Sequence, residues 1–184
     1  MPVPFEKIED KQRIVIIDNE GSTEILNIAA HVLEANQRKF DWWKANGENS
    51  ISPDAPVILI QANDHLEQST HKAKFLEYQH HIMVIHHVRE HIPPAYDSFE
   101  NYLAQYEEMA DKTPKGGSIL FNQADHVANL IAGEREREDT KLIEYGQEPG
   151  LSSHVSAAKA ILRRIGINEE LFQKGIVTYE PLQD

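Results

Sequence analysis

Residues 14–24 read Ile-Val-Ile-Ile-Asp-Asn-Glu-Gly-Ser-Thr-Glu, and this stretch decides how the fold is interpreted. The four apolar residues at its start indicate a strand buried on both faces. A helix is expected to follow, with Ser22 as its N-cap and with apolar residues at helical spacing: Ile25, Ile28, Ala29, Val32 and Leu33. Phosphate-binding loops occupy such a turn between a strand and a helix. This turn, however, has no lysine and carries two glutamates.

The rest of the chain alternates between apolar runs of strand length and segments with helical periodicity. The expected strands are 13–18, 56–61, 82–85, 118–122 and 141–145; the expected helices are 97–112, 123–132, 153–165 and a last helix capped by Asn168 and ended by Gly175. Residues 40–43 are either a short strand or a packed aromatic corner, and 46–56 is expected to be a loop.

On helix 97–112 the apolar side of the pattern is expected to lie in the core: Phe99, Tyr102, Leu103, Tyr106 and Met109. Continuous apolar strands between helices favour a mainly parallel sheet covered on both faces. The fold class is therefore α/β, a P-loop-like domain of three layers. We expect one domain over residues 13–184, preceded by an N-terminal extension, residues 1–12.

Composition restricts the class of protein. The 184 residues include 18 basic and 30 acidic ones, so the net charge is 18 − 30 = −12, which argues against binding to nucleic acid or to an anionic membrane surface. Cysteine is absent, which excludes thiolate metal sites and cysteine nucleophiles. No apolar run approaches the roughly 20 residues of a membrane span, and the polar start is unlike a secretory signal. We expect a soluble cytoplasmic protein.

Two stretches carry a resemblance to a known family. They are AYDSFENYLAQYEEMADKTPKGGSILFNQAD, residues 95–125, and SAAKAILRRIGINEELFQKGIVTYEPLQD, residues 156–184. Both resemble the central ATP-binding domain of the Mur ligases, most of all the ligases that join muramate to murein peptides. The first stretch has the long helix, the Lys-Gly-Gly turn and the strand that ends in Asn122, with Asp125 soon after. The second resembles the helical exit from that domain.

The resemblance implies binding of ATP and magnesium. The family's phosphate loop falls on residues 18–24, where Gly21 and Thr23 match, Ser22 replaces the lysine and Glu24 replaces the second threonine. It implies nucleotide-binding roles for Asn122 and Asp125 as well, although both are also ordinary turn residues. The family's His-Asn pair falls on Ser152–Ser153, one residue from His154.

For the magnesium ion, the resemblance implies a site formed by Asp64, Glu90 and His91. The family's first glutamate is Gln61 in this chain, and the family's Asp-His pair is Glu90–His91. The same three residues are alternatively an acid–base group for a different reaction.

Histidine is abundant, with ten in the chain and five between residues 80 and 91. On a strand, His80 and His86 face one side while His81 and His87 face the other, so His86 and His87 do not converge. A helical link would let His87 and His91 converge near Glu90. The alternative is a scatter of histidines around the end of a strand.

The leading hypothesis is a stand-alone, degenerate Mur ligase central domain, a pseudoenzyme that lacks ligase activity alone. Its role would be binding or assembly linked to cell-wall (peptidoglycan) peptides, with a protein partner or as a homodimer. The alternative is a residual nucleotide binder of the muramate–peptide ligase type that retains ATP and magnesium. A third reading is that the resemblance is wrong and that this is another doubly wound domain, which a mixed or antiparallel strand order would reveal.

Overall fold

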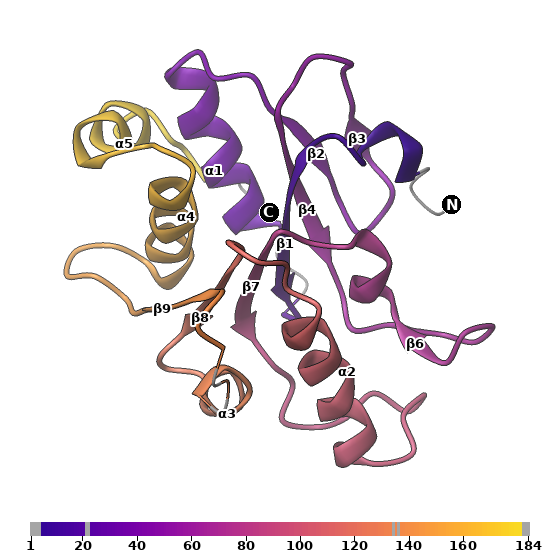
Figure 1. Ribbon diagram of the computed structural model, residues 1–184. Coiled ribbons are helices and arrows are strands. Elements are labelled where there is room, and N and C mark those ends of the chain that lie inside the picture. Colours follow the sequence, from indigo (N-terminus) through magenta and orange to yellow (C-terminus); the bar gives the residue numbers. More distant parts are fainter. Residues whose placement is uncertain (1–4, 21–22, 134, 136, 182–184) are drawn as a thin grey trace.

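A seven-stranded sheet forms the centre of the molecule in the computed structural model, which describes residues 5–20, 23–133, 135 and 137–181 (Figure 1). All strand pairs in this sheet are parallel except that of the edge strand β3 with β2. In spatial order the strands are β3 (Asn49–Ser50), β2 (Asp41–Trp43), β4 (Val57–Ala62), β1 (Gln12–Asp18), β7 (Ile82–His87), β8 (Ser118–Asn122) and β9 (Lys141–Tyr145). A small antiparallel ribbon pairs β5 (Leu66–Glu67) with β6 (Lys72–Ala73).

Helices cover both faces of the sheet, which confirms the three-layer α/β fold. One layer consists of α1 (Glu24–Ala35), α4 (Ser153–Arg164) and α5 (Glu169–Ile176), which Figure 1 shows together on one side of β1. The opposite layer consists of the 3₁₀ segment η2 (Lys74–Tyr78) with α2 (Phe99–Asp111) and α3 (His126–Gly133). The two apolar cores lie between the sheet and these layers.

The central strand β1 shows why its sequence is an unbroken apolar run. Ile14 and Ile16 pack into the core below α1 and α4, while Val15 and Ile17 pack into the core below α2. Both sets are removed from water, so an alternation of apolar and polar residues is not needed. The predicted alternation of β7 is confirmed too: Ile82 and Val84 face the first core, and Met83 and Ile85 face the second.

Several element boundaries differ from the sequence-based expectation. The helix after β1 begins at Glu24 with Thr23 at the N-cap position, whereas the predicted cap, Ser22, lies outside the described residues. The helix expected from residue 123 begins only at His126, because residues 123–125 form the turn that Asp125 closes by capping α3. The expected loop 46–56 contains the short strand β3, and the aromatic segment at 40–43 forms strand β2.

Two side-chain expectations were wrong. Gly175 does not end the last helix, which continues to Ile176; an added Cβ there would lie 2.9 Å from the Cα of Val32, so the glycine serves close packing of α5 on α1. Phe99, the first residue of α2, is 40% exposed rather than in the core. The other core positions predicted on α2 are buried or partly buried.

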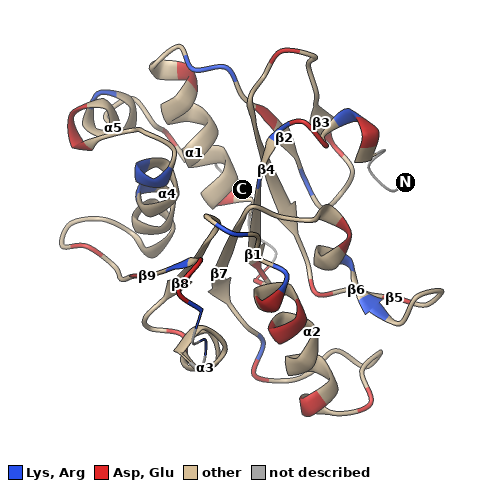
Figure 2. Cartoon of the chain, viewed as in Figure 1, with Lys and Arg blue, Asp and Glu red and all other residues tan. Residues whose placement is uncertain are grey.

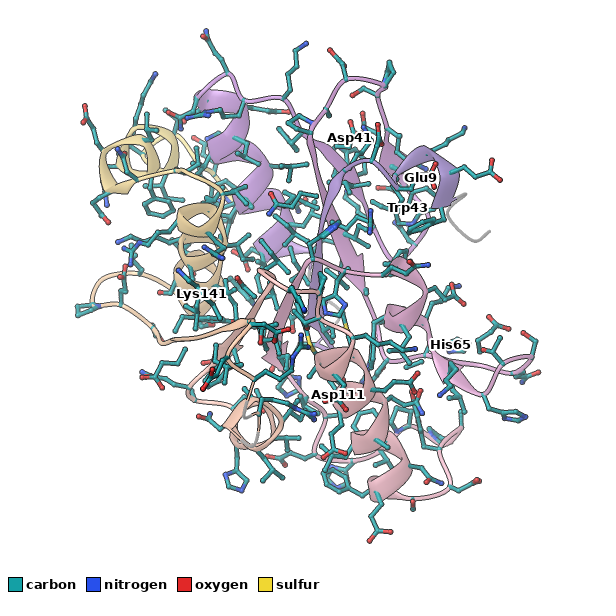
Figure 3. The ribbon with its side chains drawn as sticks, in the orientation of Figure 1. Glu9, Asp41, Trp43, His65, Asp111 and Lys141 are labelled. Atoms are coloured by element: carbon teal, nitrogen blue, oxygen red, sulfur yellow. The ribbon has the colours of Figure 1, made fainter. Side chains whose placement is uncertain are left out.

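The segment before β1 packs on the domain. It contains a short 3₁₀ turn, η1 (Phe5–Lys7), followed by Ile8, whose side chain is fully buried. The ammonium group of Lys11 lies 3.1 Å from the Asp41 carboxylate, and both side chains are buried. Figure 3 shows Glu9 and Asp41 at the same end of the molecule. Residues 5–11 are thus tied to strand β2 and to the core.

Charge is distributed over both helical layers. Figure 2 shows basic residues along α4 and acidic residues along α2. Part of the basic charge on α4 is neutralised, since Lys159 forms ion pairs with Glu148 and Glu169 at 2.7 and 2.8 Å. Among the helices of the described residues, none has both the length and the apolar character needed to cross a bilayer.

Candidate functional site

The candidate site lies where strands β1 and β7 end beside each other. The helix after β1, α1, packs on one face of the sheet, and the helix after β7, α2, packs on the other. Adjacent parallel strands whose connections leave to opposite faces form a topological switch point, and ligands of α/β proteins bind in the crevice outside the carboxyl ends of the strands there. Polar residues begin at this point on both strands, with Asp18 and His86.

Three side chains from distant segments meet at this edge: Asp18 at the end of β1, His86 near the end of β7 and His154 in the first turn of α4. One ligand-type atom of each lies within 4.8 Å of those of the other two. The Nε2 of His154 is 3.4 Å from Oδ2 of Asp18, and the two imidazole rings are 5.1 Å apart. We call these three residues the Asp-His-His cluster.

A register shift between β1 and β7 helps to form the cluster. Ile17 pairs with Ile85, but Asp18 pairs with His87, so His86 is the additional residue of a bulge. Bulges redirect side chains at the ends of strands. Asp18 and His86 lie on the same faces of their strands as Ile16 and Val84, and these faces pack against α1 and α4. The first turn of α4 therefore places His154 over them.

Glu24 and Tyr145 each form a hydrogen bond with the Nδ1 atom of one of the two histidines. Nδ1 of His154 lies 2.8 Å from Oε2 of Glu24, at the start of α1, and this nitrogen donates to the carboxylate. Nδ1 of His86 shares a hydrogen bond of 2.9 Å with the hydroxyl of Tyr145, at the end of β9. The other nitrogen of His154, Nε2, lies 3.4 Å from Oδ2 of Asp18, and Nε2 of His86 is the ring nitrogen that Tyr145 does not engage.

The cluster is strongly coupled electrostatically. Burial favours the neutral form of Asp18, but the contact with His154 and the charge at His86 outweigh it, so the pKa of Asp18 is lowered. The contact with Asp18 is the main reason that the pKa of His154 is raised, whereas burial is the main reason that the pKa of His86 is lowered. Two histidines in contact thus have opposite proton preferences, an arrangement suited to acid–base work or to cation binding.

The phosphate-loop prediction is only partly covered by the structure. Gly21 and Ser22 lie outside the described residues. Thr23 is the N-cap residue of α1, and its hydroxyl accepts a hydrogen bond of 3.1 Å from the Asn27 side chain. Glu20 lies 3.8 Å from His87, on the opposite side of β7 from His86. The predicted nucleotide contacts in this loop stay predictions.

Asn122 and Asp125 are close to the site but are engaged by the backbone. The amide of Asn122 donates to the carbonyl oxygen of His86 at 3.1 Å, which ties the end of β8 to β7. The two carboxylate oxygens of Asp125 accept from the backbone N–H groups of Val88, at 3.0 Å, and Ala128, at 2.8 Å. These hydrogen bonds give both residues a structural role. Their predicted contact with a nucleotide stays a prediction.

The predicted magnesium set does not gather around one point. The Oδ2 of Asp64 accepts from Nε of Arg89 at 2.9 Å and from the Tyr102 hydroxyl at 2.7 Å, so this buried carboxylate already has a cationic partner. Glu90 and His91 are exposed in the loop after β7. Within the described ranges, the group of three potential ligands that the structure does bring together is the Asp-His-His cluster.

The cavities of the molecule lie beside this cluster or far from it. A cavity of about 530 Å³ is at the amino ends of the strands, where its lining includes Arg13 and His80. The guanidinium of Arg13 is used there by backbone carbonyl groups, among them those of Gln79 and Glu9. A second cavity, of about 410 Å³, adjoins Tyr145 between β9 and α4. Of these two cavities, the second is next to the candidate site.

Sequence reasoning considered each member of the cluster separately and missed their convergence. Asp18 was interpreted as a charge in the phosphate loop, His86 as one of several histidines, and His154 as a residue next to a family motif. Ligands of parallel sheets bind beyond the carboxyl ends of the strands, and Asp18 and His86 lie at two such ends. Combining that rule with the side of the strand on which His86 lies was the signal available to find the site.

Comparisons with known proteins support the fold. No protein-family model matches the sequence, and no curated protein matches it. Among solved structures, the UDP-N-acetylmuramate:L-alanyl-gamma-D-glutamyl-meso-diaminopimelate ligase (MPL) from Neisseria meningitides is similar with a TM-score of 0.79 and 12% identity, covering 98% of this chain and 70% of that one. MurF from Acinetobacter baumannii is similar with a TM-score of 0.70 and 10% identity, over 97% of this chain and 48% of that one.

FolC from E. coli, solved in complex with DHPP and ADP, is similar at a TM-score of 0.60 and 9% identity, covering 95% of this chain and 59% of that one. The chain has a Mur ligase central-domain-like fold, as the resemblance in the sequence implied. It spans about half the length of the MurF chain. At these identities the similarity concerns the fold, and function must be argued from the site.

Proposed function

We propose that this chain is a Mur ligase central-domain-like protein that does not use ATP and does not carry out ligation by itself. Its carboxyl edge binds a different ligand, in a binding or assembly role linked to the cell-wall peptides on which the similar ligases act. The observation that carries the proposal is the buried Asp18 carboxylate, whose side chain is 1% exposed at the end of β1.

The charges around Asp18 oppose a nucleotide phosphate. Glu20 and Glu24 follow Asp18 in the same strand–turn–helix segment. Two like unit charges 4 Å apart repel each other by about 4 kcal/mol at an effective dielectric constant of about 20. The N-terminus of α1 favours an anion by only about 0.3–1 kcal/mol. Repulsion therefore exceeds the attraction that the helix supplies.

The described residues also fit a magnesium–nucleotide group poorly. Asp64 is neutralised by Arg89, and the position of the family's first magnesium-binding glutamate is Gln61. Magnesium prefers carboxylates and water, so a glutamine amide and an already paired carboxylate are weak substitutes. We assign Asn122 and Asp125 to structural roles, because their side chains are hydrogen-bonded to backbone groups of His86, Val88 and Ala128.

The test is thermal unfolding of the full chain, with and without millimolar ATP or ADP and Mg²⁺, followed by calorimetric titration. FolC with ADP serves as the positive control, since it was solved with that nucleotide. A ligand at 100 times its dissociation constant adds about 2.7 kcal/mol to stability, which thermal unfolding detects readily. We expect no shift for this chain.

A clear shift with either nucleotide would overturn the proposal and restore the alternative, a residual ATP- and magnesium-binding domain. Light scattering on the same sample gives the oligomeric state, where a homodimer would be seen directly. Titration with muramyl peptides then tests the link to cell-wall peptides, for which we expect saturable binding that does not require nucleotide.

A further inference from the structure

We propose that Asp18, His86 and His154 together bind one divalent transition-metal ion of the zinc type, with one coordination position left open. This site is distinct from the predicted magnesium set, Asp64, Glu90 and His91. The inference uses the same edge of the sheet as the proposed function, but it does not depend on whether nucleotide binds.

The distances in the cluster suit a single ion. Two ligand atoms that are each about 2.0–2.1 Å from a tetrahedral zinc ion lie about 3.4 Å apart. The His154 Nε2 to Asp18 Oδ2 distance is 3.4 Å, and one ligand atom from each of the three residues lies within 4.8 Å of those of the other two.

The facing atoms of Asp18 and His154 have no other hydrogen-bond partner among the described residues. Asp18 Oδ2 and His154 Nε2 are both buried, and neither makes a hydrogen bond within the part of the chain that the structure describes. The other carboxylate oxygen of Asp18 accepts from the backbone N–H of Glu20 at 3.3 Å. A charged N–H···O hydrogen bond is typically about 2.7–2.9 Å long, so the gap of 3.4 Å suits a shared cation better than a proton.

The hydrogen-bond partners of the two histidines, Glu24 and Tyr145, are of the kind that metal-ligating imidazoles usually have. A ligating imidazole usually donates its second N–H to a carboxylate or another acceptor, which sets its tautomer and orientation. Glu24 accepts from Nδ1 of His154, and the Tyr145 hydroxyl can accept from Nδ1 of His86. With both Nδ1 protons so placed, the Nε2 lone pairs are the donors that the two histidines offer to an ion.

The donor set selects the class of metal. Two imidazoles and one carboxylate suit zinc, iron or copper rather than magnesium, which prefers oxygen ligands. Three protein ligands with a free position are typical of catalytic rather than structural zinc sites. His154 is 19% exposed while Asp18 is 1% exposed, so an ion and its fourth ligand reach the cluster from the His154 side.

The experiment is a Zn²⁺ titration of chelator-treated full chain, read by calorimetry, with Co²⁺ absorption in the visible as a second readout. We expect one tight equivalent of Zn²⁺ per chain and Co²⁺ bands typical of tetrahedral coordination. His154→Gln and Asp18→Asn each weaken binding at least tenfold, and Tyr145→Phe weakens it about tenfold through loss of the group behind His86.

The matched control is His126→Gln, since His126 is exposed at the start of α3 and outside the cluster. This variant should bind Zn²⁺ as the unaltered chain does, and circular dichroism confirms that every variant is folded. Tyr145→Phe leaves all three ligands in place, so it remains informative if a ligand variant fails to fold. The inference is overturned if Zn²⁺ does not bind, or if His126→Gln weakens binding as much as His154→Gln.

Discussion

Replacing Lys11 with methionine should destabilise the protein strongly, because the buried ammonium group makes two hydrogen bonds and an ion pair that methionine cannot make. Its ammonium group donates to the carbonyl oxygens of Ser52 and Ala55, both at 2.8 Å, and lies 3.1 Å from Oδ2 of Asp41. Methionine has similar length and apolar volume but none of these donors. Lys11→Met therefore removes the charge while leaving the packing nearly unchanged.

The expected loss of stability depends on which interactions the Asp41 carboxylate keeps in Lys11→Met. One carboxylate oxygen, Oδ1, keeps its bonds to the backbone N–H and hydroxyl of Ser52, at 3.0 and 2.9 Å. The other oxygen, Oδ2, loses the ammonium and has no hydrogen-bond partner among the described residues. Removing one member of a buried ion pair costs about 3–5 kcal/mol, a large part of the roughly 5–15 kcal/mol by which a domain is stable.

The assay is urea unfolding followed by circular dichroism, with Lys39→Met as the matched control. Lys39 pairs with Asp54 on the surface, where both side chains are more than half exposed, so its loss should cost less than about 1 kcal/mol. Adding Asp41→Asn to Lys11→Met should recover part of the lost stability, because no uncompensated charge then remains. If the unfolding free energy of Lys11→Met lies within about 1 kcal/mol of that of the unaltered chain, residues 5–11 are only loosely attached to the domain, and the reasoning from burial fails.

Two further changes test the cores. Burial lowers the pKa of His80 to about 4 from the usual 6.5, so between these values the unfolded state binds more protons and stability falls as pH falls. At pH 5 the loss from His80 is about 2 kcal/mol relative to pH 8; His80→Leu should remove this part of the slope in urea unfolding, and the exposed control His126→Leu should retain it. Gly175→Ala should cost about 1–3 kcal/mol, because its Cβ would lie 2.9 Å from the Cα of Val32. Gly133→Ala meets no atom within 4 Å and should raise thermal stability by about 0.5 kcal/mol; similar melting temperatures for the two alanine variants would contradict the packing argument.

The strands and most helices could be predicted because their signals are local. An unbroken apolar run such as 14–17 is buried whichever strands become its neighbours, and the helical spacing on 97–112 marks one face for the core. The sequence-based predictions were wrong where contacts between distant segments overrode the local pattern. Gly175 has the composition of a helix end, but the close approach of α1 made it an interior residue of α5.

The sequence by itself determined the class of fold, the two-sided burial of the sheet and the edge at which polar residues gather. These follow from periodicity and from the direction of parallel strands, which are properties of short segments. Only the tertiary structure decided which polar residues meet. Asp18, His86 and His154 belong to β1, β7 and α4, and they converge because β1 and β7 are neighbours, a bulge shifts their register and α4 packs beside α1. Strand order, register and helix packing depend on contacts between distant segments, so no local pattern specifies them.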